Sequence, residues 1–302
     1  MPPRPGVAAG VASDAPVVIV APVQPAARPL LLGCDFSSAP SARKPIVVAH
    51  GSVRSTAVRL EGFERFASLD GWQAWLLAQP AWVGGFDLPF GLPRDLVEQL
   101  AWPLSWPALI AHYAALERSE IRVLFAAFCA ARPAGGKFAH RRTDGPAGSS
   151  PSMKWVNPPV AFMLHAGVPR LLAAGAFFPG LHPPELASAR VALEAYPGLL
   201  ARELIGRRSY KSDDASAQTA ERLAARVDLV AALEAGSARL GLRLRLDAPL
   251  RRLLVEDGKG DHLDAALCLV QAAWAAARSG SAGPGYGLPE GIDPIEGWIV
   301  TA

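Results

Sequence analysis

The chain has 302 residues, of which 51% are hydrophobic and 19% are charged, and its net charge is +3. This composition allows a large buried core, enough for one elaborated domain or two small ones. The charge is compatible with a nucleic-acid partner or with a small-molecule enzyme and does not decide between them. No stretch is apolar for long enough to span a bilayer, so we expect no membrane partner.

Three cysteines lie far apart in the sequence, at Cys34, Cys129 and Cys268. This spacing matches neither a disulfide framework nor a zinc site, so we expect buried thiols in a reducing, cytoplasmic environment. Residues 1–29 are rich in proline and alanine. We interpret them as a flexible tail, because their apolar core is too short and too interrupted for a signal peptide.

The first predicted elements are strands. Residues 30–36, with the sequence LLLGCDF, form a short continuous apolar run that predicts a buried strand. Residues 44–53 and 56–63 predict two further strands, separated by a polar turn at residues 54–55. Three strands in such close succession indicate an antiparallel meander.

A helix and a fourth strand follow the meander. Residues 71–79 predict a short helix with Trp72, Trp75 and Leu76 on one face. Residues 81–93 predict the next strand, and the order strand, helix, strand implies a parallel crossover.

Residues 91–186 are interpreted as a helical insertion. They contain apolar helical stretches at residues 95–102, 106–117 and 121–131, followed by a long polar loop over residues 131–155. A loop of that length inside a compact chain is usually functional or disordered.

The C-terminal part alternates strand and helix. Residues 189–198 predict a strand, residues 199–206 a helix that stops at Gly206, and residues 207–214 a basic and aromatic loop. Residues 216–235 predict an amphipathic helix, whose inner face is expected to carry Leu223, Val227, Val230 and Leu233. Residues 241–250 suit a strand or a short link, the last helix is expected to begin near Asp261, and residues 296–300 suit a terminal strand or tail.

Acidic residues end three of the predicted apolar strands, at Asp35, Asp87 and Glu194. Asp261 and Asp264 open the last helix at a spacing that puts both on one side of it. The carboxyl ends of strands form the ligand edge of an α/β sheet, so these acids converge if the strands are neighbours. Like charges repel and raise one another's pKa, which a divalent cation would relieve.

Carboxylate oxygens favour Mg²⁺ or Mn²⁺ over zinc. Two such ions, ~3.5–4 Å apart, can hold an attacking water and a leaving oxygen during phosphodiester cleavage. Each acid also has a structural interpretation. Asp35 suits an Asx turn, Asp87 a helix cap and Glu194 a charge at the rim. Asp261 and Asp264 suit the first turn of the last helix, where acids are favourable through capping and the helix dipole.

Two basic loops supply candidate substrate contacts. The segment HRRTD carries Arg141 and Arg142, and the segment RRSYK carries Tyr210 and Lys211 behind two further arginines. Guanidinium forks and an aromatic platform suit phosphates and stacked bases. Arg141 and Arg142, which precede Thr143 and Asp144, suit an internal ion pair as an alternative.

Seven ordered motifs carry a family resemblance: GCDFSSAP, GGFDLPFGLP, HRRTD, LEAYPG, YKSDD, DHLDAALCLVQAAWAA and EGWIV. Over residues 30–300 the chain resembles domain of unknown function 429, a bacterial and archaeal family described as predicted nucleases with a ribonuclease H-like fold. At one remove, its acids resemble those of RuvC-type Holliday-junction resolvases. That resemblance implies that Asp35 lies on the first strand, that Asp87 ends the fourth, and that Asp261 and Asp264 open the C-terminal helix. Glu194 belongs to the family's Glu-x-Tyr-Pro pattern and has no resolvase counterpart.

We therefore expect an α/β chain with a ribonuclease H-like mixed sheet, an antiparallel meander followed by parallel strands, over a single domain spanning residues 30–302 with an insertion at about 91–186. The expected function is that of a Mg²⁺- or Mn²⁺-dependent nuclease acting on DNA or RNA. The expected catalytic residues are Asp35, Asp87, Asp261 and Asp264, and the expected metal ligands are Asp35, Asp87, Asp264 and Glu194. The alternatives are a non-catalytic nucleic-acid or protein-binding module and a nucleotide-handling enzyme of the actin or sugar-kinase type.

Overall fold

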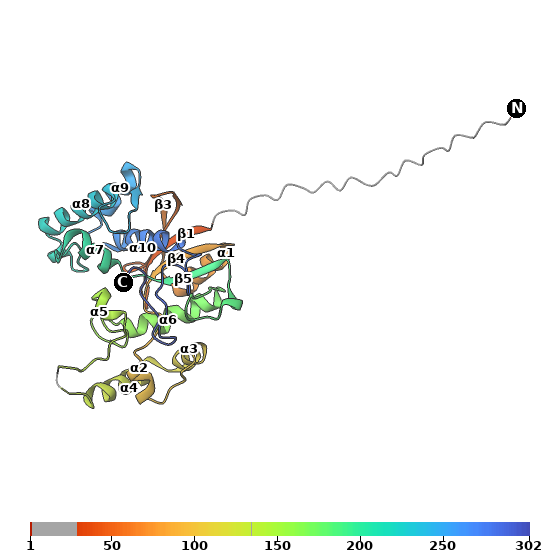
Figure 1. The fold of residues 1–302 in the computed structure, drawn as a ribbon. Helices are drawn as coiled ribbons and strands as arrows, with labels where there is room; N and C mark the ends of the chain where they lie inside the picture. Colours follow the sequence, from red (N-terminus) through yellow and green to blue (C-terminus); the bar gives the residue numbers. More distant parts are fainter. Residues whose placement is uncertain (2–28, 134) are drawn as a thin grey trace.

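The centre of the fold is a six-stranded mixed sheet with the strand order β5-β4-β1-β2-β3-β6 (Figure 1). The computed structural model describes residue 1 and residues 29–133 and 135–302, so almost all of the predicted tail lies outside the described residues. The strands are β1 (Leu30–Asp35), β2 (Ile46–Arg54), β3 (Ala57–Phe66), β4 (Trp82–Asp87), β5 (Arg190–Glu194) and β6 (Arg243–Arg245). The predicted α/β class is confirmed.

Strand pairing follows the predicted pattern. Strand β2 runs antiparallel to both β1 and β3, which confirms the meander. Strand β4 returns through helix α1 (Leu69–Ala78) and pairs in parallel with β1, which confirms the crossover. Strand β5 continues the sheet in parallel beyond β4. The carboxyl ends of β1, β4 and β5 therefore lie at one edge of the sheet.

Helices cover both faces of the sheet. Because successive residues of a strand point to opposite faces, alternate residues enter two separate cores. Leu32 and Val48 belong to the core under α1 and the insertion. Leu31 and Val47 belong to the opposite core, together with residues of α7 (Pro197–Ile205), α8 (Ala220–Ala235), α9 (Ala248–Glu256) and α10 (Asp261–Ala276). Helix α7 ends at Gly206, as predicted.

Residues 91–186, which we interpret as an insertion, contribute five α-helices among the described residues: α2 (Arg94–Gln99), α3 (Trp106–Ala115), α4 (Arg118–Ala130), α5 (Asp144–Ala147) and α6 (Val160–Ala173). In Figure 1, α6 lies between the sheet and the group α2 to α4. The first three match predicted helical stretches. Helix α6 goes beyond them, because Gly167 and Pro169 interrupt its helical pattern in the sequence.

The predicted inner face of α8 is partly wrong. Leu223 and Val227 are 42% and 37% exposed, whereas Val230 and Leu233 are buried as expected. Arg226 takes a buried place on this helix, because its guanidinium donates to the backbone carbonyls of Tyr210 (2.8 Å) and Val255 (2.7 Å). A buried arginine is tolerated when its donors are satisfied, but a search for apolar periodicity assigns every arginine to the outer face. The following segment, which suited a strand or a link, forms β6 and then α9.

Helix α10 crosses the sheet against β1, β2 and β4 at unusually close range. A Cβ atom at Gly33 in β1 would collide with the backbone of Ala265 and Leu269, and one at Gly85 in β4 would lie 2.7 Å from the carbonyl oxygen of Cys268. Because these glycines have no side chains, α10 can pack directly against the backbone of β1 and β4. This close packing places the first turn of α10 beside the ends of the strands.

The prediction of buried thiols is confirmed, since Cys34, Cys129 and Cys268 are all buried and free in the described part of the chain. Among residues 29–133 and 135–302, no helix has both the length and the apolar composition that crossing a membrane requires.

Candidate active site

Two of the predicted acids stand next to each other. Asp35 and Asp87 are the last residues of β1 and β4 and are register partners across this parallel pair. Both side chains are half-buried. Among the described residues, no donor forms a hydrogen bond or ion pair with either carboxylate. Their oxygens are therefore free to accept a cation or a proton.

The third acid, Asp264, reaches the same edge from α10 and is fully buried. One of its oxygens accepts a hydrogen bond of 2.5 Å from the hydroxyl of Tyr210, and the other contacts the ammonium of Lys211. Lys211 is 43% exposed over its side chain, so its stem borders solvent while its charged end meets the acid. Tyr210 and Lys211 thus bring the predicted basic loop directly onto the acidic edge.

Asp261 lies one turn earlier on α10, at the rim of the site. The N-cap of the helix is Gly260, in a left-handed conformation with φ of 76°, so the capping interpretation of Asp261 does not apply. Burial raises the pKa of Asp261, and repulsion from Asp257 and Asp264 raises it further. Asp261 therefore lies close enough to Asp257 and Asp264 for their negative charges to disfavour its ionisation.

The pKa values show that the acids act on one another. Burial raises the pKa of Asp35 well above its usual range, repulsion from Asp264 adds to this, and Lys211 opposes it. Burial and Asp264 likewise raise the pKa of Asp87 to about 7, again against Lys211. For Lys211, burial acts to lower the pKa, but attraction to Asp264 outweighs it and the pKa rises well above normal. The site therefore holds one protonated lysine against three carboxyl groups.

The fit to a divalent cation depends on Lys211. Carboxylate oxygens from three elements form the donor set that Mg²⁺ and Mn²⁺ prefer. However, in the part of the chain that the structure describes, no group of three or more His, Cys, Asp or Glu side chains stands ready to hold a metal ion. Tyr210 and Lys211 occupy the oxygens of Asp264. Asp35 and Asp87 carry the oxygen donors that a hard cation prefers and are unpaired among the described residues, whereas Asp264 would be available to an ion only without its contact to Lys211.

Glu194, the acid at the end of β5, has a protein partner in place of an ion. Its oxygens accept from the guanidinium of Arg141 at 2.7 and 2.8 Å and from the backbone N–H of Phe90 at 2.9 Å. Arg141 also donates to Asp144 at 2.9 Å. Burial raises the pKa of Glu194, and Arg141 opposes that rise. This is the internal ion pair that the sequence left open for Arg141, and it ties the insertion to the sheet edge.

Arg142 differs from its neighbour. Its backbone N–H donates to Glu296 at 2.8 Å, and its side chain is exposed. It does not line the cavities that surround Asp87. Of the four predicted substrate contacts, the structure therefore brings Tyr210 and Lys211 to the acids, buries Arg141 in an ion pair, and places Arg142 apart.

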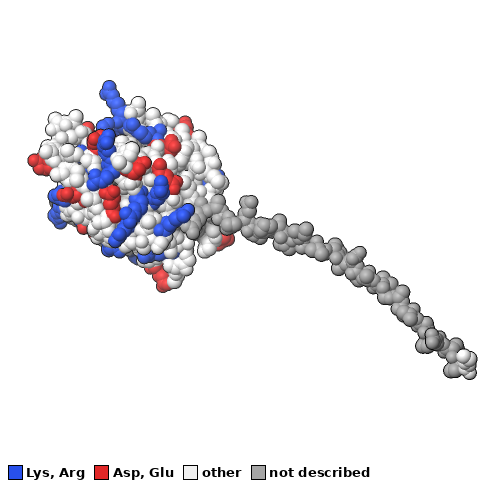
Figure 2. Space-filling view, turned by 90° about the horizontal axis from the view of Figure 1, so that it is seen from above, with Lys and Arg blue, Asp and Glu red and all other residues white. Residues whose placement is uncertain are grey.

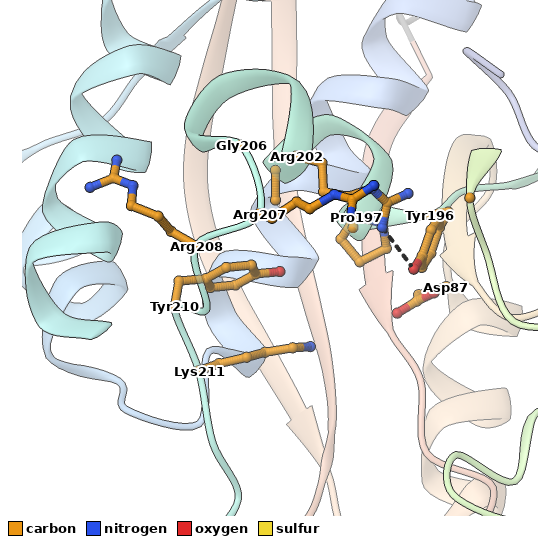
Figure 3. A pocket seen from close by; sticks show the side chains of 12 residues that line it. Asp87, Tyr196, Pro197, Arg202, Gly206, Arg207, Arg208, Tyr210 and Lys211 are labelled. Atoms are coloured by element: carbon orange, nitrogen blue, oxygen red, sulfur yellow. Dashed lines mark hydrogen bonds between the residues drawn. The ribbon is translucent and has the colours of Figure 1, made fainter. Parts of the chain in front are cut away.

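Three cavities meet at the acids, since Asp87 and Lys211 line all of them. The largest, of about 520 Å³, also contains Tyr196, Arg202 and Arg207. Figure 3 shows the side chains of Tyr210 and Lys211 extending side by side in the direction of Asp87. A second cavity, of about 390 Å³, contains Asp35 and Asp261. The acidic edge is therefore open to a ligand from two directions.

Sequence reasoning did not select two residues of the largest cavity, Tyr196 and Arg202. Arg202 donates to the Tyr196 hydroxyl at 3.3 Å, and its guanidinium lies 5.3 Å from the centre of that ring. The signal for Tyr196 was present in the Glu-x-Tyr-Pro pattern, in which it follows Glu194 by two positions. The position of Arg202 depends on the start of α7 and on the carbonyl of Ala147, which the sequence does not bring together.

Comparison of the chain with protein-family models, with curated proteins and with solved structures found no match.

Proposed function

We propose that this chain is a Mg²⁺- or Mn²⁺-dependent nuclease with a ribonuclease H-like core, as the resemblance to domain of unknown function 429 implies. One observation carries the proposal: Asp35, Asp87 and Asp264 come from two neighbouring parallel strands and a crossing helix and meet at one open edge. The antiparallel meander followed by parallel strands supports the same core. The cavities at this edge leave room for a substrate.

In this proposal, Asp35 and Asp87 hold the ion, Asp264 joins them when Lys211 turns away, and Asp261 contributes from the rim. When bound, such ions activate a water and neutralise the charge that develops on the leaving oxygen of a phosphodiester. The hydrogen bond from Tyr210 keeps Asp264 oriented. Lys211, with its half-exposed side chain, can then neutralise a substrate phosphate beside the acids.

The test is a cleavage assay on labelled single-stranded, double-stranded and branched DNA and RNA, with Mg²⁺, with Mn²⁺ and with a chelator. Asp35→Asn and Asp264→Asn should each abolish the metal-dependent cleavage while the thermal unfolding transition remains cooperative. A matched control is Asp228→Asn, an exposed acid whose ion pair among the described residues is with Arg208, which should cleave like the wild type. Equal cleavage by the wild type and the two site variants would reject the proposal.

A second candidate function is a metal-independent nucleic-acid binding module. The observation that favours it is the contact of Lys211 with Asp264, which already neutralises part of the acidic charge. Such a module should bind nucleic acid equally well with and without a chelator, should retain binding in Asp35→Asn, and should cleave none of the substrates above.

A further inference from the structure

We infer that the largest cavity at the acidic edge binds one nucleotide of a single-stranded nucleic acid, with its phosphate on Arg207 and its base or sugar against the wall formed by Tyr196 and Pro197. We call this cavity the nucleotide pocket. The inference rests on the proposed function and deepens it, because it names the strandedness of the substrate and the side from which it enters.

The size of the nucleotide pocket suits a small ligand. Its volume of about 520 Å³ lies within the range of about 300–1,000 Å³ that is usual for small-molecule sites. Three segments enclose it: the start of α7, the loop of residues 206–211, and Gly148 after α5. A single extended strand can place one base and its phosphate in such a space, whereas a double helix has no way to do so without unpairing.

The pocket combines an apolar wall with available positive charge. Tyr196, Pro197 and Ala201 form the apolar part of its lining. Arg202 is held in place by the Tyr196 hydroxyl and the Ala147 carbonyl. Arg207 is exposed and, within the described residues, has no hydrogen-bond or ion-pair partner. Guanidinium groups of this kind match phosphate, and aromatic and apolar surfaces accept bases of any sequence.

Two consecutive arginines point in different directions. Both arginines line the pocket, but Figure 3 shows Arg207 on the same side as Arg202 and Lys211, whereas the guanidinium of Arg208 extends away toward α8. There Arg208 pairs with Asp228 at 2.7 Å. Of this pair, the pocket therefore has Arg207 as its free cation. Substituting each of these two adjacent arginines in turn therefore gives a matched pair of variants, since both substitutions remove the same group from the same loop.

The position of the pocket connects it to the acids. Asp87 lines the pocket and also lines the cavity that contains Asp35 and Asp261. A strand whose phosphate rests on Arg207 therefore continues across the acidic edge into the second cavity, where Lys44 and Lys259 lie. The phosphodiester next to the held nucleotide is the one that the acids face.

The surface charge offers no rival binding place on the face that Figure 2 shows. Proteins that bind nucleic acid, whether duplex or single strand, generally present a basic patch, stripe or groove. The face that Figure 2 shows mixes lysine and arginine with aspartate and glutamate, and the net charge is only +3. On that face, therefore, no basic stripe competes with the pocket as the place of binding.

The experiment measures binding by fluorescence anisotropy in a chelator, so that cleavage plays no part. The probes are fluorescein-labelled eight-residue oligo-dT and oligo-U and a blunt DNA hairpin. We expect both single strands to bind more tightly than the hairpin. Arg207→Gln should weaken single-strand binding about tenfold and reduce the salt slope by about 0.7, as expected for one lost phosphate contact. Arg208→Gln should stay within about twofold of the wild type, since its guanidinium is already engaged by Asp228 and by the carbonyl of Ile205 and is not free to bind a phosphate.

Equal losses in the two arginine variants would overturn the proposal, as would hairpin binding as tight as single-strand binding, or no binding of either oligonucleotide. A difference between oligo-dT and oligo-U, which differ in the sugar and in the thymine methyl group, would identify the preferred strand of the two and would support the pocket in either case. Because no metal is present, failure of the nuclease proposal leaves this result unchanged. Conversely, cleavage lost in Asp35→Asn with equal binding by both arginine variants would reject the pocket alone.

Discussion

Asp35 and Asp87 are register partners at the ends of two neighbouring parallel strands, half-buried and without a hydrogen-bond donor among the described residues. Two acids in this arrangement disfavour each other's ionisation, and Asp264 adds a third charge. The protein gains nothing in stability from such a cluster, which is why it indicates a site for binding or catalysis. The predictions below test that interpretation and the packing that creates the cluster.

The first prediction concerns pH in metal-free buffer. The pKa of Asp87 is raised to about 7 by burial and by Asp264, so ionising it costs more in the folded than in the unfolded protein. A raised pKa of this kind contributes stability below the ordinary carboxyl pKa, and this contribution is lost as pH rises through about 7. The melting temperature should therefore fall as the pH rises from about 4 to about 7 and should level off above that range. Asp87→Asn should flatten this dependence and raise the melting temperature at pH 8.

Burial lowers the pKa of His165 and His182, so these histidines titrate within the same range, but they are common to the wild type and the variant and cancel in the comparison. Melting curves at half-unit steps provide the measurement. The interpretation is wrong if the slope in Asp87→Asn matches that of the wild type.

The second prediction concerns competition between Lys211 and a metal ion. The ammonium of Lys211 contacts Asp264, so a divalent cation must displace it to use that acid. Lys211→Met should therefore bind Mn²⁺ more tightly than the wild type, by about fivefold or more, a typical coupling between competing ligands. Calorimetry with Mn²⁺ alone gives the affinity. The control is Lys137→Met, an exposed lysine that lines none of the three cavities at the acids and should bind Mn²⁺ like the wild type. Unchanged or weaker binding in Lys211→Met would show that the lysine does not compete.

The third prediction concerns the close approach of α10 to β1. A methyl group at Gly33 would meet the backbone of Ala265 and Leu269, which cannot rotate away as a side chain can. Gly33→Ala should therefore lower the free energy of unfolding by about 1–3 kcal/mol, the usual cost of overpacking a core. It should also move Asp264 away from the strand ends. Urea denaturation measures the first effect.

The matched control for this change is Gly145→Ala, where an added Cβ meets nothing within 4 Å. This variant should keep the wild-type midpoint. Equal midpoints for both glycine variants would mean that α10 does not need Gly33 for its position.

The fourth prediction separates the two interpretations of Arg141. Removing its guanidinium leaves Glu194 and Asp144 buried and unpaired, so Arg141→Met should cost about 3–5 kcal/mol of unfolding free energy. Arg142→Met, at the neighbouring exposed position, should change stability by less than about 0.5 kcal/mol. Chemical denaturation of both variants gives the comparison. Wild-type stability in Arg141→Met, together with weaker oligonucleotide binding, would favour a substrate role instead.

Much of the edge was predictable from sequence, because local patterns specify it. Short apolar runs predicted β1 and β4, each ending in an acid, and helical spacing predicted α10 with Asp264 in its first turn. Buried apolar residues recur about every two residues in a strand and about every 3.6 residues in a helix, so these elements can be predicted without knowing what they pack against. Helix α8 shows the limit, since the buried Arg226 shifted its inner face away from the apolar residues Leu223 and Val227.

Only the tertiary structure decided how the charges pair. Arg141 meets Glu194 across 53 positions of sequence, and Lys211 meets Asp264 across another 53, so neither pair follows from local spacing. The same holds for Arg207 and Arg208, which are adjacent in the chain but lie on opposite sides of their loop. The sequence determined which elements carry acids and bases, because periodicity and turn chemistry are local. Packing determined which of those groups are neutralised and which stay available, because that depends on the distances between elements once the sheet, α7 and α10 have come together.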